Sequence, residues 1–419
     1  MLNFIAVVGV VAMWAGAWAL CKNRRDINWK TIGWGIALQL VFALLVLKTR
    51  PGQWCFETIN DLFVFILSFQ KAGAEFVFGS LGASSSGFYF AFQVLPTIIF
   101  FSALMAVLYY LGIMQMVVSS IARVMTYTCK SSGAESLTVA ANIFVGQTEA
   151  PLLVRPFIER MTESELFTVM VAGMATMSGG VVAAYVGMLQ DVVPNVAGHI
   201  LTASVMAAPA ALVMSKMMAP EVAEPETRSA LKIEYKDPSN NVVDAAANGT
   251  ITGLQLALNV GAMLIAFLGL IALFNGILGG ATAWLGSHIF GMQTAGFNLQ
   301  DIIGWCFSPV AWLMGVEWKD CVTLGQLMGE KFIANEFVAY SHLSNILKAT
   351  PDLLSPRSTI VAVYALCGFA NVSSIGILIG GLSGMAPGRK QDVARLGIRC
   401  LIAASLCGFL NGAIAGILN

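Results

Sequence analysis

The chain has 419 residues, of which 57% are hydrophobic and only 11% are charged, and its formal net charge is zero. An ordinary soluble domain carries about 25% charged residues, so this composition predicts a protein that crosses a membrane many times. The zero net charge argues against a polybasic surface that binds nucleic acid. Eight scattered cysteines without a CxxC spacing point neither to a zinc site nor to a disulfide framework.

The N-terminal segments are expected to form two spans, an interfacial stretch and a third span. Residues 1–20 are apolar and precede a cluster of basic residues, which predicts a retained first helix with its N-terminus outside. Residues 31–47 are expected to return outward. The amphipathic residues 54–70 fall short of a span and are expected to lie along the outer interface. A long helix at residues 94–118 is then expected to cross inward.

Residues 132–157 form the first segment that is expected to enter the membrane without crossing it. A glycine and two prolines interrupt an apolar sequence there, which predicts a re-entrant hairpin that opens inward. Glu149 lies in the middle of this hairpin. An ionised carboxylate at the bilayer centre costs about 2.5 to 3.5 kcal/mol, so Glu149 is expected to face a cavity, a partner or a substrate. The alternative is a packing acid that is protonated or paired with Arg155.

The remaining topology follows from the distribution of basic residues. Further spans are expected at residues 166–189, 197–217, 254–274, 359–382 and 396–418, with a polar cytoplasmic linker at residues 219–248. The apolar run at residues 302–314 is too short for a span and is expected to be interfacial or re-entrant. If it crossed, Arg389, Lys390 and Arg395 would lie outside. The expected total is eight spans with both termini outside.

The two halves of the chain share an inverted arrangement. Residues 320–343 carry Asn335 and Glu336 in a second uncrossed segment, which is expected to open outward. Each hairpin precedes a span that small and polar residues interrupt, at residues 175–180 in the first half and 371–376 in the second. Two hairpins of opposite sense, each with an acid near its tip and a broken helix after it, are typical of a secondary transporter with its site at the membrane midplane.

Three motifs in this arrangement carry a resemblance to a known family. They are GQTEAP at residues 146–151, ANEFVAY at residues 334–340 and CGFANVSSIGIL at residues 367–378. Two further segments, LPTIIFFSAL at residues 95–104 and LQLALNVGAML at residues 254–264, extend the similarity over nearly the whole chain. In this order the motifs resemble the concentrative nucleoside transporter family in its bacterial type.

The resemblance implies an all-α polytopic membrane protein with eight transmembrane helices, two oppositely oriented re-entrant hairpins and interfacial helices. It implies a homotrimer in the cytoplasmic (inner) membrane that imports nucleosides such as uridine with a cation gradient, by an elevator-like alternating-access mechanism. The scaffold would comprise residues 1–120 and 251–300, the transport domain would comprise the repeats at residues 121–217 and 301–419, and residues 218–250 would be a linker.

The resemblance also implies a set of substrate-binding residues. The nucleobase would be bound by Gln147, Thr148 and Glu149 with Val181 along its apolar face, and the ribose by Glu336, Asn371 and Ser374 with Leu256 and Phe369 packed nearby. These residue types suit the ligand. A carboxylate accepts charge-assisted hydrogen bonds from adjacent ribose hydroxyls, and an amide such as that of Gln147 both donates and accepts at a pyrimidine edge.

The coupling cation is placed by the same resemblance between the first hairpin and the broken span that follows it. Its ligands would be backbone oxygens of Asn142, Val145, Thr176 and Met177, together with the Thr176 hydroxyl. Freed carbonyls at a broken helix suit a hard cation, so sodium is expected, and protons are the alternative coupling ion. Taken alone, the Thr176 hydroxyl would rather bond back to its own helix.

Other function classes lack their motifs in this sequence. Neither GxSxG nor HExxH occurs, so an intramembrane enzyme is not expected, and the absence of GxxxxGK[ST] argues against an ATP-driven pump. No cofactor other than the coupling ion is expected. A channel for small polar solutes remains an alternative, because polar re-entrant loops also line pores.

Overall fold

The computed structural model describes residues 1–83, 89–227, 239–289 and 298–419, and helices are the only regular secondary structure in these ranges. The N-terminal helices are α1 (Leu2–Ala19), α2 (Trp29–Lys48), α3 (Arg50–Phe78), α4 (Phe90–Tyr110) and α5 (Ile113–Cys129). The first repeat contains α6 (Gly133–Ala141), the 3-10 helix η4 (Ala150–Val154), α7 (Arg155–Ile158), α8 (Glu163–Ala175), α9 (Gly179–Leu189) and α10 (Val196–Met218). The remaining helices are α11 (Val242–Ile289), α12 (Leu299–Leu313), α13 (Cys321–Ile333), α14 (Glu336–Ala349), α15 (Pro356–Leu366), α16 (Val372–Met385) and α17 (Lys390–Leu418).

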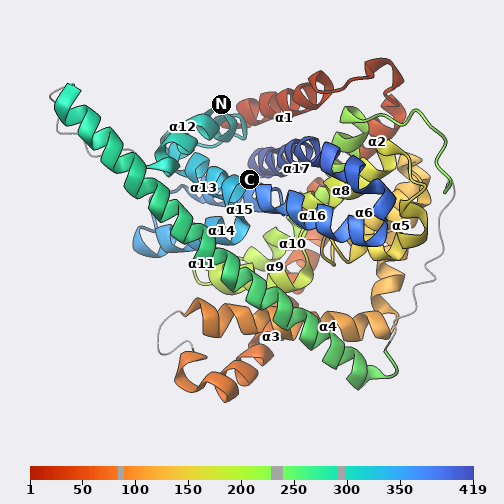
Figure 1. Cartoon of the computed structure of the whole chain (residues 1–419), viewed down its shortest axis with the longest axis horizontal. Coiled ribbons are helices and arrows are strands. Elements are labelled where there is room, and N and C mark those ends of the chain that lie inside the picture. The colour runs from red at the N-terminus through yellow and green to blue at the C-terminus, as the bar shows by residue number, and fades with distance from the viewer. Residues whose placement is uncertain (84–88, 228–238, 290–297) are drawn as a thin grey trace.

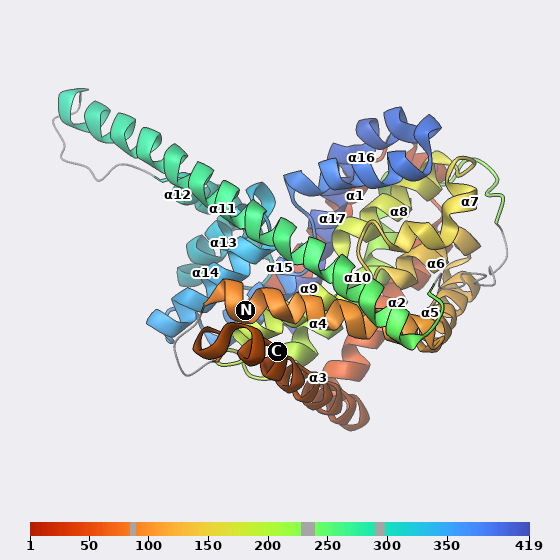
Figure 2. The same ribbon diagram turned by 60° about the horizontal axis from the view of Figure 1, so that its bottom comes forward.

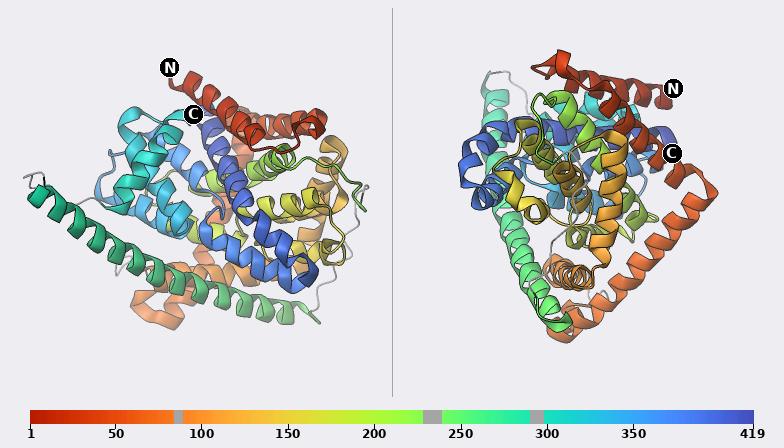
Figure 3. Two further views of the ribbon diagram at one scale, coloured as in Figure 1. Left: turned by 45° about the horizontal axis from the view of Figure 1, so that its top comes forward. Right: turned by 90° about the vertical axis from the view of Figure 1, so that its right-hand side faces the viewer.

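Helices α8, α9 and α10 form the centre of the molecule. In an apolar 18-residue stretch of the span made by α8 with α9, and again in one of α10, 89% of the residues are buried, whereas only 17% are buried in such a stretch of α11. Figure 1 shows α11 as a long helix across the outside of the other helices, and Figure 3 shows α3 and α11 at the outer edges. The exposed side chains of α11 include Leu258 and Ile265. Such an apolar outer surface suits contact with lipid or with another protein.

The two termini lie on the same side of the molecule. Helix α1 packs against α17, and the N- and C-terminal ends are close together in Figures 1 and 2. This arrangement agrees with the expectation that both termini face the same side of the membrane.

Eight helical segments in the described part of the chain are long and apolar enough to cross a membrane, and seven of them coincide with expected spans. The eighth contains α3, which has 29 residues, so the prediction that this stretch is too short for a span is wrong. The helix starts earlier than the apolar run because Thr49 accepts a hydrogen bond from the Gly52 backbone N–H (3.1 Å) and Pro51 lies in the first turn. The expected span at residues 359–382 consists instead of two shorter helices, α15 and α16.

Two other expected boundaries differ from the structure. The helix predicted at residues 94–118 is divided, because α4 ends at Tyr110 and Gly112 adopts φ +79° before α5 begins. This left-handed conformation favours glycine and ends helices. Helix α11 begins at Val242 and therefore includes the last residues of the expected linker at 219–248. Three basic residues of that linker, Arg228, Lys232 and Lys236, lie outside the described residues.

Both predicted hairpins are present as pairs of helices joined by a turn. In the first, α6 is followed by a turn and by η4 and α7; in the second, α13 and α14 meet at Ala334 and Asn335. Both following helices are interrupted, between α8 and α9 and between α15 and α16. The second interruption lies at residues 367–371, slightly before the predicted position. The reason is that Asn371 caps α16 through its side chain, which accepts a hydrogen bond from the Ser374 backbone N–H (2.9 Å).

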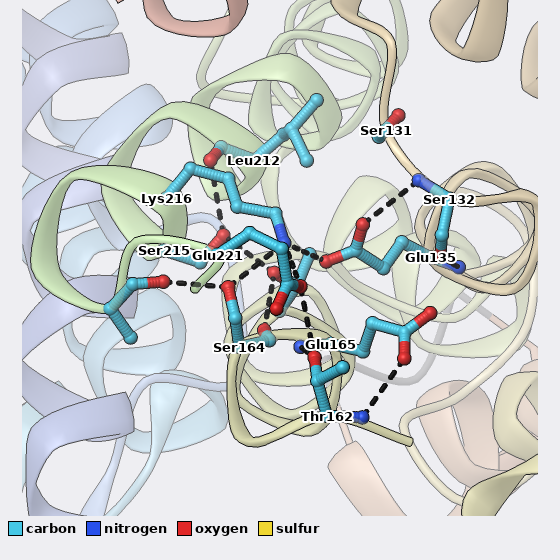
Figure 4. A network of polar contacts seen from close by, with 12 residues as sticks. Ser131, Ser132, Glu135, Thr162, Ser164, Glu165, Leu212, Ser215, Lys216 and Glu221 are labelled. Atoms are coloured by element: carbon cyan, nitrogen blue, oxygen red, sulfur yellow. Dashed lines mark hydrogen bonds and ion pairs between the residues drawn. The ribbon is translucent and has the colours of Figure 1, made fainter. Parts of the chain in front are cut away.

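A buried polar network holds the base of the first hairpin, as Figure 4 shows. Ser132 and Glu135 form a capping box at the start of α6. The ammonium of Lys216 on α10 pairs with the Glu135 carboxylate and donates to the Ser164 hydroxyl of α8 (2.9 Å) and to Glu221 (3.3 Å). Lys216 and Glu135 are both buried, so three helices are fixed to one another at this point.

Candidate functional site

The tip of the first hairpin is a tight polar turn. The Glu149 carboxylate accepts a hydrogen bond from the Gly146 backbone N–H, and the Glu149 and Ala150 N–H groups donate back to the Gly146 carbonyl, each at 3.1 Å. No ion pair joins Glu149 to Arg155 among the described residues. The alternative reading of Glu149 as a partner of Arg155 is therefore wrong for this structure.

Glu336 is held at the tip of the second hairpin by two donors from other elements. Its side chain is only 3% exposed and lies in the first turn of α14. The Tyr185 hydroxyl of α9 donates to one carboxylate oxygen (2.9 Å), and the Asn371 side-chain amide donates to the other (3.0 Å). Because a buried carboxylate needs such partners, this geometry fixes the position of its oxygens.

The first hairpin meets the second interrupted helix through Gln147 and Ser374. The Gln147 side-chain amide donates to the Ser374 hydroxyl at 3.4 Å, across 227 residues of sequence. Since Ser374 also donates its backbone N–H to Asn371, a continuous chain of hydrogen bonds runs from Gln147 through Ser374 and Asn371 to Glu336. The other polar atom of Gln147, its side-chain oxygen, is buried without a hydrogen-bond partner among the described residues. It is available to a bound donor.

The other expected substrate residues lie on the elements that contribute to this series of hydrogen bonds or adjoin it. Val181 is buried one turn before Tyr185 on α9, so both side chains lie on the same face of that helix. Thr148 approaches Gly381 of α16, where an added Cβ would lie 2.9 Å from a Thr148 methyl carbon. Phe369 lies in the interrupted segment and donates its backbone N–H to the Thr176 carbonyl (3.4 Å).

A cavity of about 470 Å³ adjoins the first hairpin. Of the expected substrate residues, Glu149 and Leu256 line it; the expected cation ligand Val145 does so too, with Phe144 and Gly146 of the hairpin and Ser102 of α4. Gln147, Glu336, Asn371 and Ser374 do not line it. The structure thus separates Glu149 and Leu256, which face this cavity, from the hydrogen-bonded residues that join the two hairpins.

The two segments that carry the expected cation ligands are joined where the first hairpin meets the break between α8 and α9. The Gly179 backbone N–H donates to the Phe144 carbonyl at 2.9 Å and ties the two segments together. In the described part of the chain, no hydrogen bond ends on the carbonyl oxygens of Asn142, Val145 or Met177. Free carbonyls at the end of a half-helix are suited to a small hard cation.

Asn142 and Thr176 complete this region. Asn142 is fully buried, and neither polar atom of its side chain has a hydrogen-bond partner among the described residues. Burial of an amide without partners is costly, so the Asn142 side chain suits a site that takes a polar ligand. The Thr176 hydroxyl donates to the Ala172 carbonyl at 2.8 Å, as the alternative reading expects. This bond uses the hydroxyl proton and leaves the oxygen lone pairs free for a cation.

Two polar residues of this region are missed by the sequence analysis. Tyr185 binds Glu336, and its position one turn after Val181 is the only sequence signal for it. Lys331 is 3% exposed on α13 and lies among the apolar residues of the second hairpin. A lysine in a hairpin that enters a membrane is a sequence signal, because its charge, like that of Glu149, requires a cavity, a partner or a substrate.

Comparison with known proteins gives consistent matches along the chain. Three family models match, described as "Na+ dependent nucleoside transporter N-terminus" over residues 8–81, "Nucleoside recognition" over residues 91–191 and "Na+ dependent nucleoside transporter C-terminus" over residues 199–416. An uncharacterized transporter of Haemophilus influenzae is 45% identical over 98% of this chain and 97% of its own length.

A mammalian relative and two solved structures extend these matches. Sodium/nucleoside cotransporter 1 of Rattus norvegicus is 42% identical over 98% of this chain, which spans 62% of that protein. The structure of CNTnw in an inward-facing substrate-bound state superposes with a TM-score of 0.92 at 41% identity, covering 100% of this chain and 98% of CNTnw. A CNTnw variant in an outward-facing state gives the same TM-score, identity and coverage.

Proposed function

Since this chain belongs to the Na⁺-dependent nucleoside transporter family, we propose that it imports uridine or another pyrimidine nucleoside together with sodium. The family and the two CNTnw states support the general function. The chain is a multi-pass transporter of the cytoplasmic membrane that moves nucleosides by alternating access, and it is not an enzyme. The substrate, the coupling ion and the residue roles below are parts of the proposal.

The ribose is assigned to the second hairpin. The observation that carries the proposal is the hydrogen-bonded chain from Gln147 through Ser374 and Asn371 to Glu336. Adjacent ribose hydroxyls donate to a carboxylate in charge-assisted bonds, and here Glu336 is already oriented by Tyr185. A bound nucleoside would exchange the internal bonds of Ser374 and Asn371 for bonds to its own hydroxyls. Phe369 would supply an apolar contact beside the sugar, and Leu256 would add one from the cavity that it lines with Glu149.

The base is assigned to the first hairpin. Among the described residues the side-chain oxygen of Gln147 has no partner and its amide donates to Ser374, so Gln147 can present both a donor and an acceptor to a pyrimidine edge. Thr148 and Glu149 lie beside it at the same tip, and Val181 supplies an apolar surface from α9.

Sodium is assigned to the meeting of the first hairpin with the break after α8. Its ligands would be the free carbonyl oxygens of Asn142, Val145 and Met177, the Thr176 carbonyl and the Thr176 hydroxyl. The unpartnered side chain of Asn142 supports a polar ligand at this place. These groups are hard oxygen donors, which favours sodium over soft metals.

We further propose a homotrimer in which the helices of residues 1–120 and 251–300 form the fixed scaffold. The repeats at residues 121–217 and 301–419 would move as the transport domain, and residues 218–250 would link the two. The support is the division between buried and exposed helices: α4 and α11 pack together at the outside, while α8, α9 and α10 are enclosed.

Uptake of labelled uridine into proteoliposomes tests this function. An inward sodium gradient at a clamped membrane potential should drive concentrative uptake, and unlabelled uridine inside the vesicles should accelerate entry of label by counterflow. Uptake that is driven by an inward proton gradient and does not depend on sodium would identify protons as the coupling ion. Uptake that neither saturates nor shows counterflow would identify a channel.

A further inference from the structure

The two interrupted helices meet back to back at the centre of the protein. Gly368, in the second interruption, has φ +102°, and an added Cβ there would lie 2.5 Å from the Ala175 carbonyl oxygen at the end of α8. The neighbouring Phe369 N–H donates to the Thr176 carbonyl. Each helix end carries roughly half a negative elementary charge on its free carbonyls. The ends of α8 and α15 therefore place two regions of like charge next to each other.

A lysine compensates this charge in the second repeat. The Lys331 ammonium donates to the carbonyl oxygens of Ala365 (3.0 Å), in the last turn of α15, and of Cys367 (3.1 Å), the residue that caps its C-terminal end. The side chain is 3% exposed, so the ammonium has exchanged its water for these oxygens.

The first repeat has a neutral residue at the corresponding place. Lys331 lies at the end of the first helix of the second hairpin, and Asn142 lies at the end of the first helix of the first hairpin. Lys331 lies by the end of α15, the first half of the interrupted helix that follows its hairpin. The segment that begins at Asn142 is tied to the break after α8 by the bond from the Gly179 N–H to the Phe144 carbonyl. Lys331 binds the carbonyls there with an ammonium, whereas Asn142 is buried without a partner beside carbonyls that accept no hydrogen bond in the described residues.

We propose that Lys331 is a tethered cation that fills, in the second repeat, the position that corresponds to the sodium site of the first repeat. The ammonium is fixed to the chain and cannot leave with the substrate, so this residue limits coupling to one exchangeable sodium ion per nucleoside. Without it, the carbonyls of Ala365 and Cys367 form a latent second sodium site. The inference rests on the proposed sodium site at Asn142 and deepens it.

Replacing Lys331 by asparagine tests this directly, because it gives the second repeat the residue that the first repeat has. In Lys331→Asn, uridine binding to the purified full-length protein should need roughly a hundredfold more sodium, since two strong charged hydrogen bonds are lost. The sodium response should steepen from a Hill coefficient of about one toward two, because two ions would bind cooperatively with uridine. In proteoliposomes, the ratio of labelled sodium to labelled uridine should rise in the same direction.

Two variants serve as controls. Lys331→Arg keeps the charge and should keep the slope of the wild type. Lys319→Asn removes an exposed lysine just before the same hairpin, where its partner is Glu317, and should change neither slope nor ratio. Sodium should raise the thermal unfolding temperature of Lys331→Asn more steeply than that of the wild type, at constant ionic strength with choline as the replacement ion. This measurement applies even to a variant that has lost transport.

Three results would overturn the inference. They are a single-sodium response in Lys331→Asn that equals the wild type, a variant that no sodium concentration stabilises or restores, and a wild type that moves two sodium ions per uridine. Failure of the proposed function looks different. In that case uridine binding by the wild type would not depend on sodium, so the wild type would have no sodium response with which to compare that of Lys331→Asn.

Discussion

Single residues in this protein act through partners that come from distant parts of the chain. Glu336 receives one hydrogen bond from Tyr185 and another from Asn371, and each donor belongs to a different helix. A charged acceptor in a nearly dry place is worth more than the same group in water, and it is costly when left unpaired. The affinity for substrate should therefore depend strongly on the charge of Glu336 and on little else at that position.

Glu336→Gln is expected to abolish nucleoside uptake while the protein still assembles. The amide keeps the volume of the side chain but loses charge-assisted bonds, each contributing about 1.5 to 3 kcal/mol, so uridine affinity should fall by roughly tenfold to a hundredfold or more. Calorimetric titration of the purified variant measures this. As a control on the wild type, free uracil should barely compete with uridine, and nucleosides that lack ribose hydroxyls should bind more weakly. Near-normal affinity of the variant would remove Glu336 from the ribose site.

Gln147→Ala is expected to change selectivity among bases. The alanine leaves donors and acceptors of the base without partners in a partly dry site, at a cost of about 1 to 3 kcal/mol that differs from one base to another. The measurement is competition by uridine, cytidine and adenosine in the same preparation. Ser374→Ala is the matched control, because it removes the same internal hydrogen bond from the ribose side and should weaken all three nucleosides together. If Gln147→Ala also lowers all three by one common factor, its role is structural.

Some helices and hairpins of this fold are predicted by the sequence, and others are not. Glycine, proline and polar residues inside apolar segments predict both hairpins and both interrupted helices, because each breaks a helix locally. The length of α3 is not predicted, since its cap at Thr49 precedes the apolar run that marks the helix. The partners of Tyr185 and Lys331 are 151 and 34 residues away. Such contacts follow from packing and not from local pattern, and for that reason these two residues are missed.

The base of the first hairpin should depend on its buried ion pair. Lys216→Met leaves the Glu135 carboxylate buried without its cation, which typically costs about 3 to 5 kcal/mol of unfolding free energy. A marked drop in the thermal unfolding temperature of the purified protein would show it. The double variant Lys216→Met with Glu135→Gln should recover part of the loss, because no buried charge then remains. Arg160→Met, which breaks the exposed pair with Glu226, should cost only about 0 to 1 kcal/mol. Equal effects of the two single variants would show that burial does not matter here.

The two repeats are joined at the residues that are proposed to bind substrate and sodium. The hydrogen bond between Gln147 and Ser374 joins the hairpin of one repeat to the interrupted helix of the other, and Phe369 joins the two interruptions. The proposed sodium ligands at Asn142 and Val145 precede Gln147 in the same turn. A cation that orders this turn would also orient Gln147 toward the base, so the two ligands should assist each other.

Sodium and uridine are therefore expected to bind with positive coupling. By thermodynamic reciprocity, the factor by which sodium tightens uridine must equal the factor by which uridine tightens sodium, and such couplings are typically about 5- to 150-fold. Thr176→Ala removes one oxygen ligand while the backbone ligands remain, so it should raise the sodium concentration needed for half-maximal uptake and alter uridine affinity less at saturating sodium. Thr176→Ser keeps the hydroxyl and should be mild. Calorimetric uridine titrations across sodium concentrations at constant ionic strength measure the coupling. An affinity for uridine that does not depend on sodium but rises steeply as pH falls would assign the coupling to protons, because the carbonyl and hydroxyl ligands of the proposed sodium site do not titrate near neutral pH.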